Sequence, residues 1–233
     1  MREIVLDTET TGLDPQDGHR IVEIGAVELY NHVPTGNVYH QYINPLISMP
    51  DQAFAIHGLS DEFLSDKPKF SEIAKEFLDF IGSSKLVIHN AAFDIKFINA
   101  ELRSIDEEEI TFERTTDTLA IARNRFPGSP VSLDSLCRKF KIDNSARVVH
   151  GALLDSQILA EVYLELVGGK QPDFALNIEN VSTENNNPIY NEKRAQVRKG
   201  KLKSRLTEEE KAKHGNFIKA LGNNSMWAKI LKS

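Results

Sequence analysis

The sequence predicts an α/β fold, a mixed sheet flanked by helices, followed by a C-terminal tail of different composition. Apolar, β-branched runs come first along the chain, and segments with helical periodicity then alternate with one further run of this kind. Strands and helices in this order are typical of a mixed sheet with helices packed against it. The 233 residues, 40% of them hydrophobic, suffice for one domain of about 170–200 residues and an appendage.

Four segments are predicted to be strands: Glu3–Leu6, Ile21–Leu29, Val38–Ile43 and Leu86–Ile88. Between the second and the third, Gly36 and Asn37 indicate a hairpin-like turn. Five segments have apolar residues at helical spacing, and we expect them to form helices: Phe70–Ile81, Ala92–Leu102, Asp117–Arg125, Leu133–Phe140 and Ala152–Val167.

The single cysteine and the absence of long apolar runs indicate where the protein acts. Cys137 lies in a periodic segment and is expected in the core. A lone cysteine excludes a disulfide within the chain, which fits a reducing cytoplasm. The sequence has no apolar run of about 18 residues, and its first residues lack the layout of a signal peptide. We therefore expect a cytoplasmic protein without a membrane span.

Charge is distributed unevenly. Residues 190–233 contain twelve Lys or Arg and four Asp or Glu, a net charge of +8. Because the whole chain has a net charge of −6, residues 1–189 carry −14. An acidic body binds phosphate backbones poorly. If it acts on nucleic acid, metal ions must neutralise the site and another contact must hold the substrate nearby.

The chain after residue 169 is expected to form a linker and a C-terminal segment. Residues 177–191 contain six asparagines and few apolar side chains, which is typical of a flexible linker. A basic stretch at 193–205 precedes Thr207 and Glu210, which predict the capping box of a helix that runs to Leu221 and ends at Gly222. The predicted domains are therefore 1–169, the linker 170–192 and the segment 193–233.

Asp7 and Glu9 form the first motif with chemical meaning. They follow the strand at residues 3–6, and their side chains point the same way because side chains alternate along a strand. Neighbouring carboxylates repel each other, and oxygen ligands of this kind suit Mg²⁺ or Mn²⁺. Gly12 then lets the chain turn away. Taken alone, the motif is better explained by an exposed turn with two solvated acids.

Two further motifs complete the first. Asp94 is expected in the first turn of the helix that follows the strand at 86–88, and Asp155 in the first turn of the last long helix, with His150 just before it. Separately, Asp94 is explained as an acid favoured by the helix dipole, and His150 as a loop histidine. Together, each at the edge of a predicted element, they indicate one site.

These motifs resemble those of the DEDD-type 3′→5′ exonucleases whose third motif is H-x(4)-D. The sequence is most similar to the proofreading subunits of bacterial DNA polymerase III, in the stretches Asp7–Leu13, Ile24–Glu28, His57-Gly58, Leu86–Asp94 and His150–Leu166. The resemblance covers residues 3–169 well and the tail more loosely. It implies a ribonuclease-H-like fold with a mixed five-stranded sheet, and an enzyme that releases nucleoside monophosphates from a DNA 3′ end.

The resemblance also implies a role for each motif residue. Asp7, Glu9 and Asp155 are expected to bind two divalent cations, Mg²⁺ or Mn²⁺, with Asp7 bridging them. Asp94 is expected to act on the second cation through water. His150 is expected to take the proton from the attacking water, because histidine exchanges protons near neutral pH. Two cations about 4 Å apart activate that water and stabilise the leaving oxygen.

Residues 52–58 resemble the terminal-nucleotide pocket of the same family. Gln52 and His57 are expected to bond the nucleotide, while Leu13 and Ile56 wedge beside the last base. The expected substrate contacts are thus Gln52 and His57, together with the metal ligands Asp7, Glu9 and Asp155. The alternative for His57 is a structural residue that caps or packs beside Gly58.

Two motifs in the tail indicate protein partners. Gln171, Phe174 and Leu176 have the spacing of a bacterial sliding-clamp motif, although an incidental apolar linker is the alternative. Trp227 lies in an apolar C-terminal cluster and is typical of an interface anchor, or else packs on its own domain. The resemblance implies the polymerase III alpha subunit as its partner, and a small accessory subunit is a further candidate. Tethering would raise the local concentration of the enzyme at the primer end.

Two other functions remain open from the sequence. An exoribonuclease of the same family has the same five site residues, which do not distinguish sugars, although the clamp-like motif favours DNA. A non-catalytic scaffold that bridges polymerase and clamp is the other. Mutually repelling carboxylates argue against it, because a scaffold does not need them.

Overall fold

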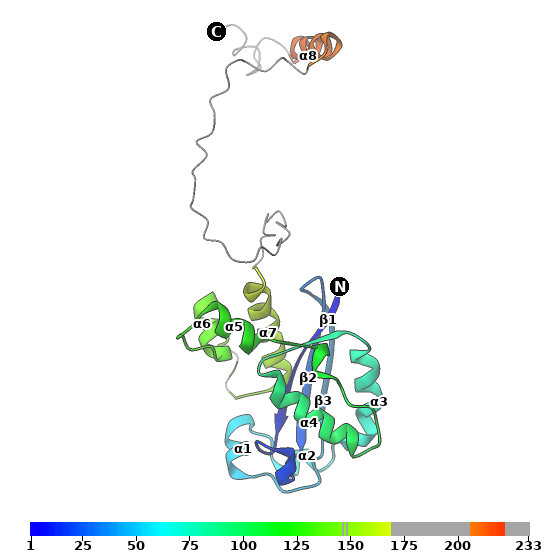
Figure 1. Cartoon of the computed structure of the whole chain (residues 1–233), viewed down its shortest axis with the longest axis vertical. Helices are drawn as coiled ribbons and strands as arrows, with labels where there is room; N and C mark the ends of the chain where they lie inside the picture. Colours follow the sequence, from blue (N-terminus) through cyan, green and yellow to red (C-terminus); the bar gives the residue numbers. More distant parts are fainter. Residues whose placement is uncertain (146, 148, 169–205, 222–233) are drawn as a thin grey trace, which may run out of the picture. The chain divides into compact units, whose positions relative to one another are not determined.

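The computed structural model describes residues 1–145, 147, 149–168 and 206–221 (Figure 1). The chain divides into two compact units, Met1–Leu176 and Asn177–Ser233. In the first unit, five strands form one mixed sheet in the order β3-β2-β1-β4-β5. Helices pack against both faces of this sheet. The predicted fold class is confirmed, including the fifth strand that the family resemblance implied.

The first three strands, β1 (Arg2–Thr10), β2 (Ile21–Tyr30) and β3 (Val33–Tyr42), pair antiparallel. β1 is longer than its apolar run, so Asp7 and Glu9 lie within the strand and not behind it. Their ladder partners on β2 are Gly25 and Glu23. Pairing with β2 extends β1 through the acids, and an apolar pattern alone does not report such pairing.

The turn between β2 and β3 is formed by Asn31 and His32, so the prediction of a turn at Gly36 and Asn37 was wrong. Both turn residues have positive φ angles, 51° and 65°. A two-residue turn with this geometry matches the twist of the paired strands, and asparagine tolerates it well. Gly36, with φ of 94°, lies inside β3, whose ladder with β2 contains a register shift.

The other two strands extend the sheet on the opposite side of β1. β4 (Lys85–Ile88) pairs parallel with β1, and β5 (Thr115–Asp117) pairs parallel with β4. The residue pattern did not predict β5, because its three residues are polar and half-buried. The helix predicted from Asp117 begins one residue later, as α5 (Thr118–Arg125). The Asp117 side chain caps it by accepting the Leu119 N–H.

The remaining body helices agree with the predicted segments to within one residue at each end. They are α3 (Phe70–Ile81), α4 (Ala91–Arg103), α6 (Leu133–Phe140) and α7 (Ala152–Leu166). Two short helices, α1 (Asp51–His57) and α2 (Asp61–Leu64), were not predicted. Short 3₁₀ turns lie at Pro15–Asp17 and Phe112–Arg114.

The described part of the second unit is α8 (Glu208–Ala220), which begins at the predicted capping box. Thr207 Oγ1 accepts the Glu210 N–H, and the Glu210 carboxylate accepts the Thr207 N–H at 2.8 Å. Several predictions lie outside the described residues: the linker, the basic stretch, Gly222, Gln171, Phe174, Leu176 and Trp227. No helix of the described segments is both long and apolar enough to cross a membrane.

Alternation along β1 divides the core between the two faces of the sheet. Ile4 and Leu6 join the cluster formed with α3 and α4, whereas Val5 packs toward α7. Cys137 is buried beside α7, as predicted. Asp7 and Glu9 share the face of Val5, so the folding of β1 directs both carboxylates toward the beginning of α7.

Candidate active site

Three predicted site residues meet at the N-terminal end of α7. Glu9, His150 and Asp155 each place one possible ligand atom within 4.8 Å of the others. Asp155 lies in the first turn of α7, and the backbone N–H of His150 is fixed by the Ile56 carbonyl at 3.1 Å. Glu9 and Asp155 are buried, whereas the His150 side chain is 48% exposed. The first and third motifs therefore form one site.

Asp94 reaches the same site from α4. β4 ends at Ile88 while β1 continues to Thr10, so α4 begins beside the part of β1 that β4 does not pair with. Asp94 Oδ1 accepts the Thr8 N–H at 3.1 Å and the Thr8 hydroxyl at 2.7 Å. Burial raises the pKa of Asp94 to about 7, although these hydrogen bonds lower it.

The electrostatics of the site favour a bound cation. Burial, followed by the charges of Asp94, Glu9 and Asp155, raises the pKa of Asp7 well above its usual value. Burial and the neighbouring Asp155 and Glu23 raise the pKa of Glu9 to about 8. A divalent cation would remove the cost of these crowded charges. The carboxylate oxygens of the site are donors that fit Mg²⁺ or Mn²⁺.

Two charged residues near the site were missed by the sequence analysis. Buried Glu23 lies opposite Glu9 on β2 and pairs with His40 at 2.7 Å. Arg147 contacts both oxygens of Asp155, at 2.5 and 2.7 Å. Glu23 lies on a predicted strand, but its place opposite Glu9 follows from the register of β1 and β2, which the residue pattern does not report. Arg147 lies in an irregular loop, and no local pattern indicates its contact.

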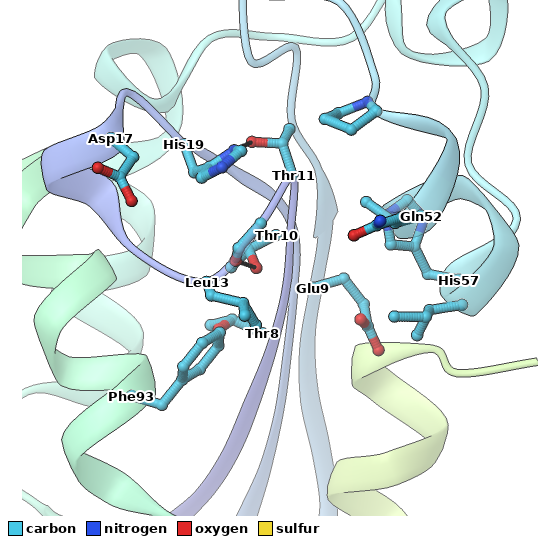
Figure 2. A pocket seen from close by; sticks show the side chains of 14 residues that line it. Thr8, Glu9, Thr10, Thr11, Leu13, Asp17, His19, Gln52, His57 and Phe93 are labelled. Atoms are coloured by element: carbon cyan, nitrogen blue, oxygen red, sulfur yellow. Dashed lines mark hydrogen bonds between the residues drawn. The ribbon is translucent and has the colours of Figure 1, made fainter.

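A cavity of about 540 Å³ opens on one side of Glu9 (Figure 2). Gln52 and His57 line it from α1, and Leu13 and Ile56 lie at its rim with 84% and 51% exposure. His57 Nδ1 also accepts the Leu59 N–H at 3.1 Å, and burial lowers the pKa of this histidine. His57 thus has both the structural contact and the cavity position that the sequence left as alternatives.

A second groove, of about 530 Å³, adjoins this cavity at Glu9. Thr8, Glu9 and Phe93 line both, while Asp7, Asp94 and Asp155 line the groove. Figure 2 also shows two unpredicted wall residues, His19 and Asp17; His19 Nδ1 lies 3.2 Å from Thr11 Oγ1. Glu9 therefore lies at the border of the two cavities, and the other three carboxylates line the groove.

Comparison with known proteins agrees with this arrangement. Residues 4–163 match the family model described as exonuclease. The DNA polymerase III subunit epsilon of Rickettsia felis is 51% identical over 224 residues, which cover 95% of this chain and 97% of that protein. The chain belongs to the DNA polymerase III epsilon subunit family. The Escherichia coli K12 member is 54% identical over 177 residues, 72% of each chain.

Solved structures show the same fold. Exonuclease X in complex with 5′ overhanging duplex DNA has a TM-score of 0.57 and 27% identity, covering 71% of this chain and 90% of that chain. The nuclease domain of 3′hExo, a DEDDh family member bound to rAMP, has a TM-score of 0.60 at 20% identity, covering 71% and 91%. The predicted epsilon-subunit family, fold and exonuclease activity are confirmed. Exonucleases of this family use divalent metal ions, which the site above fits.

Proposed function

We propose that this chain removes mispaired nucleotides from the 3′ end of a DNA primer as the proofreading subunit of a bacterial replicase. One observation supports this most directly: Glu9 lies at the border between a cavity and a groove, and the other site carboxylates line the groove. A 3′-terminal nucleotide in the cavity that contains Gln52 and His57 would present its phosphodiester to the carboxylates. The preceding nucleotide would then lie in the groove. A cavity of this volume is typical of small-ligand sites, which span about 300–1,000 Å³.

Each site residue has a role in this proposal. Asp7, Glu9 and Asp155 would hold two cations, Mg²⁺ or Mn²⁺, and the Thr8 hydrogen bonds would orient Asp94 toward the second. When bound, the cations would help to activate water and to neutralise the leaving 3′ oxygen. His150 would accept a proton from the attacking water, since its side chain is half-exposed beside the carboxylates. Leu13 and Ile56 would contact the last base at the rim.

Partner binding is proposed for the tail. Gln171, Phe174 and Leu176 would bind the sliding clamp, and the segment around Trp227 the polymerase alpha subunit. A small accessory subunit would bind the body. The net charge of −14 over residues 1–189 supports this division, because an acidic body needs partners to bring it to DNA. All of these contacts belong to a cytoplasmic assembly.

A primer-degradation assay tests the proposed activity. Purified full-length protein with Mg²⁺ should release nucleoside monophosphates from a 3′-mismatched primer. Asp7→Ala should abolish release, and His150→Ala should lower it about 10²–10⁴-fold. The control is Asp66→Ala, because the Asp66 side chain is 75% exposed next to Lys67. Undiminished release by Asp7→Ala would contradict the assignment.

The remaining alternative concerns the sugar of the substrate, that is, whether the enzyme degrades DNA or RNA. Single-stranded DNA and RNA of the same sequence, degraded in parallel, distinguish the proposed activity from an exoribonuclease. We expect faster degradation of DNA, and preference for RNA would replace the proofreading function with RNA trimming. A scaffold function would require an inactive site with intact polymerase binding.

A further inference from the structure

Arg147 makes the densest set of polar contacts at the site, although its side chain is only 9% exposed. Its Nε and Nη2 donate to the two oxygens of Asp155 at 2.5 and 2.7 Å. Its Nη1 donates to Asp134 Oδ1 at 2.9 Å, and its Nη2 also donates to His150 Nδ1 at 2.7 Å. One guanidinium thus joins a proposed metal ligand, the proposed general base and a carboxylate of α6.

The contact with Asp155 uses the carboxylate oxygens that a bound cation would need. A cation bound by Asp155 must coordinate the same carboxylate oxygens that the guanidinium occupies in a two-point pair. Such pairs are among the stronger charge-assisted hydrogen bonds, so the exchange has a cost. Asp134 is a second anion on the far side of Arg147, and its side chain is 50% exposed. Arg147 therefore has a carboxylate partner when a cation takes Asp155.

The contact with His150 couples the same exchange to the general base. Arginine only donates hydrogen bonds, so His150 Nδ1 must be the acceptor. The lone pair of that nitrogen is then engaged, and the proton of a neutral ring lies on Nε2. While Arg147 holds both groups, His150 has no free lone pair to offer to water.

We propose that Arg147 is a positioning residue that competes with a divalent cation for Asp155 and releases His150 Nδ1 when the cation binds. This rests on the proposed assignment of Asp155 as a metal ligand. A competing role and a purely supporting role of Arg147 predict opposite changes in metal affinity when the residue is replaced. Removing a residue that only orients a metal ligand lowers metal affinity about 10–100-fold. Removing a competitor raises the affinity.

Calorimetric titration of the full-length protein with Mn²⁺, without DNA, measures this sign. Arg147→Met should bind Mn²⁺ about tenfold more tightly than the unmodified chain, and Arg147→Lys should fall between them because lysine cannot make the two parallel bonds. Arg123→Met is the matched control. Arg123 is an exposed arginine that lines the same groove and has no carboxylate partner among the described residues. A smaller gain in Mn²⁺ affinity for Arg123→Met than for Arg147→Met would show that the effect comes from direct competition and not from the loss of one positive charge.

A second measurement tests the coupling to His150. In ¹⁵N spectra of the unmodified chain at constant pH, Mg²⁺ should shift the His150 Nδ1 signal. In Arg147→Met, this signal should already differ without Mg²⁺. Equal or weaker Mn²⁺ binding by Arg147→Met, or a His150 signal insensitive to Mg²⁺, would overturn the proposal. Unchanged Mn²⁺ binding by Asp155→Ala would instead reject the ligand assignment on which it rests.

Discussion

Gly25 on β2 lies against the backbone of Leu153 in the first turn of α7. A Cβ atom on Gly25 would lie 2.2 Å from the Leu153 nitrogen, a distance that real Cβ contacts do not reach. The Ser156 hydroxyl also donates to the Gly25 carbonyl at 2.8 Å. These two contacts determine how closely the start of α7, and with it Asp155, approaches the carboxylates of β1.

Gly25→Ala is therefore expected to damage the site more than the fold. The added methyl group must displace backbone, so Asp155 should shift relative to Glu9. Displacements of about 1 Å lower activity about 10²-fold, whereas overpacking costs about 1–3 kcal/mol of unfolding free energy. Primer-degradation kinetics and urea unfolding measure the two effects. Gly215→Ala on α8 is the control, because nothing lies within 4 Å of its Cβ position; undiminished activity of Gly25→Ala would contradict the prediction.

Breaking the pair between Arg20 and Glu101 should lower stability. Arg20, just before β2, donates to both Glu101 oxygens, at 2.7 and 2.5 Å, and the Glu101 side chain is only 4% exposed. Glu101→Gln removes one charge of a largely buried pair. Because Arg20 is one-third exposed, we expect a loss of about 2 kcal/mol in urea unfolding, below the range for fully buried pairs.

The control is the exposed pair of Arg103 and Glu109, with side chains 67% and 47% exposed. Arg103→Ala should cost less than about 1 kcal/mol. Equal losses for the buried and the exposed pair would show that burial of Glu101 does not increase its contribution.

Local sequence patterns predicted those elements whose own residues carry the structural signal, such as a cap or an apolar spacing. α6 begins where Ser132 caps it, and α3 has buried residues at helical spacing, so both boundaries were predictable. β5 was not, because Thr115–Asp117 forms a strand only through its partner β4. Likewise, Asn31 and His32 form a turn because the register of β2 and β3 requires one there.

The residues of the candidate site also fall into two groups, those that local patterns predicted and those that depend on contacts between elements. Asp7, Glu9, Asp94, His150 and Asp155 were found because each lies at a recognisable place in a motif. Arg147 and Glu23 depend on contacts between distant segments. Glu23 lies opposite Glu9 on the neighbouring strand, and Arg147 reaches Asp155 from an irregular loop. Such contacts follow from how the elements pack, which one sequence does not report.

Thr8→Val tests the orientation of Asp94. The substitution keeps the side-chain shape but removes the 2.7 Å hydrogen bond from the hydroxyl, while the 3.1 Å bond from the backbone remains. Partners of this kind affect metal affinity or activity about 10–100-fold. We expect activity to fall about tenfold and more Mg²⁺ to be required for half-maximal rate. Thr115→Val, which removes a hydroxyl bond to the Phe112 carbonyl far from the site, should have neither effect.

The raised pKa of Glu9 predicts a pH dependence of stability in the absence of divalent cations. The pKa of Glu9 is about 8 in the folded chain and near 4.5 without these surroundings. Between these values the folded protein keeps a proton that the unfolded chain releases, so the free energy of unfolding falls as pH rises. In EDTA, the part of the unfolding free energy that comes from the Glu9 proton should be complete below pH 4.5 and lost progressively up to pH 8. Melting temperatures recorded across this range test it.

Glu9→Gln isolates the contribution of this carboxyl group. The amide has no proton to release, so the variant should lose less stability between pH 5 and pH 8 than the unmodified chain. Asp94, with its pKa raised to about 7, retains its own share of the decline. Glu62→Gln, at an exposed position of α2, should follow the unmodified chain. Mg²⁺ should raise the melting temperature of the unmodified chain most at pH 8. Metal ligands must be deprotonated, and at this pH the carboxylates have released more of their protons than at lower pH. Parallel curves for Glu9→Gln and the unmodified chain would contradict the assignment of the pH dependence to Glu9.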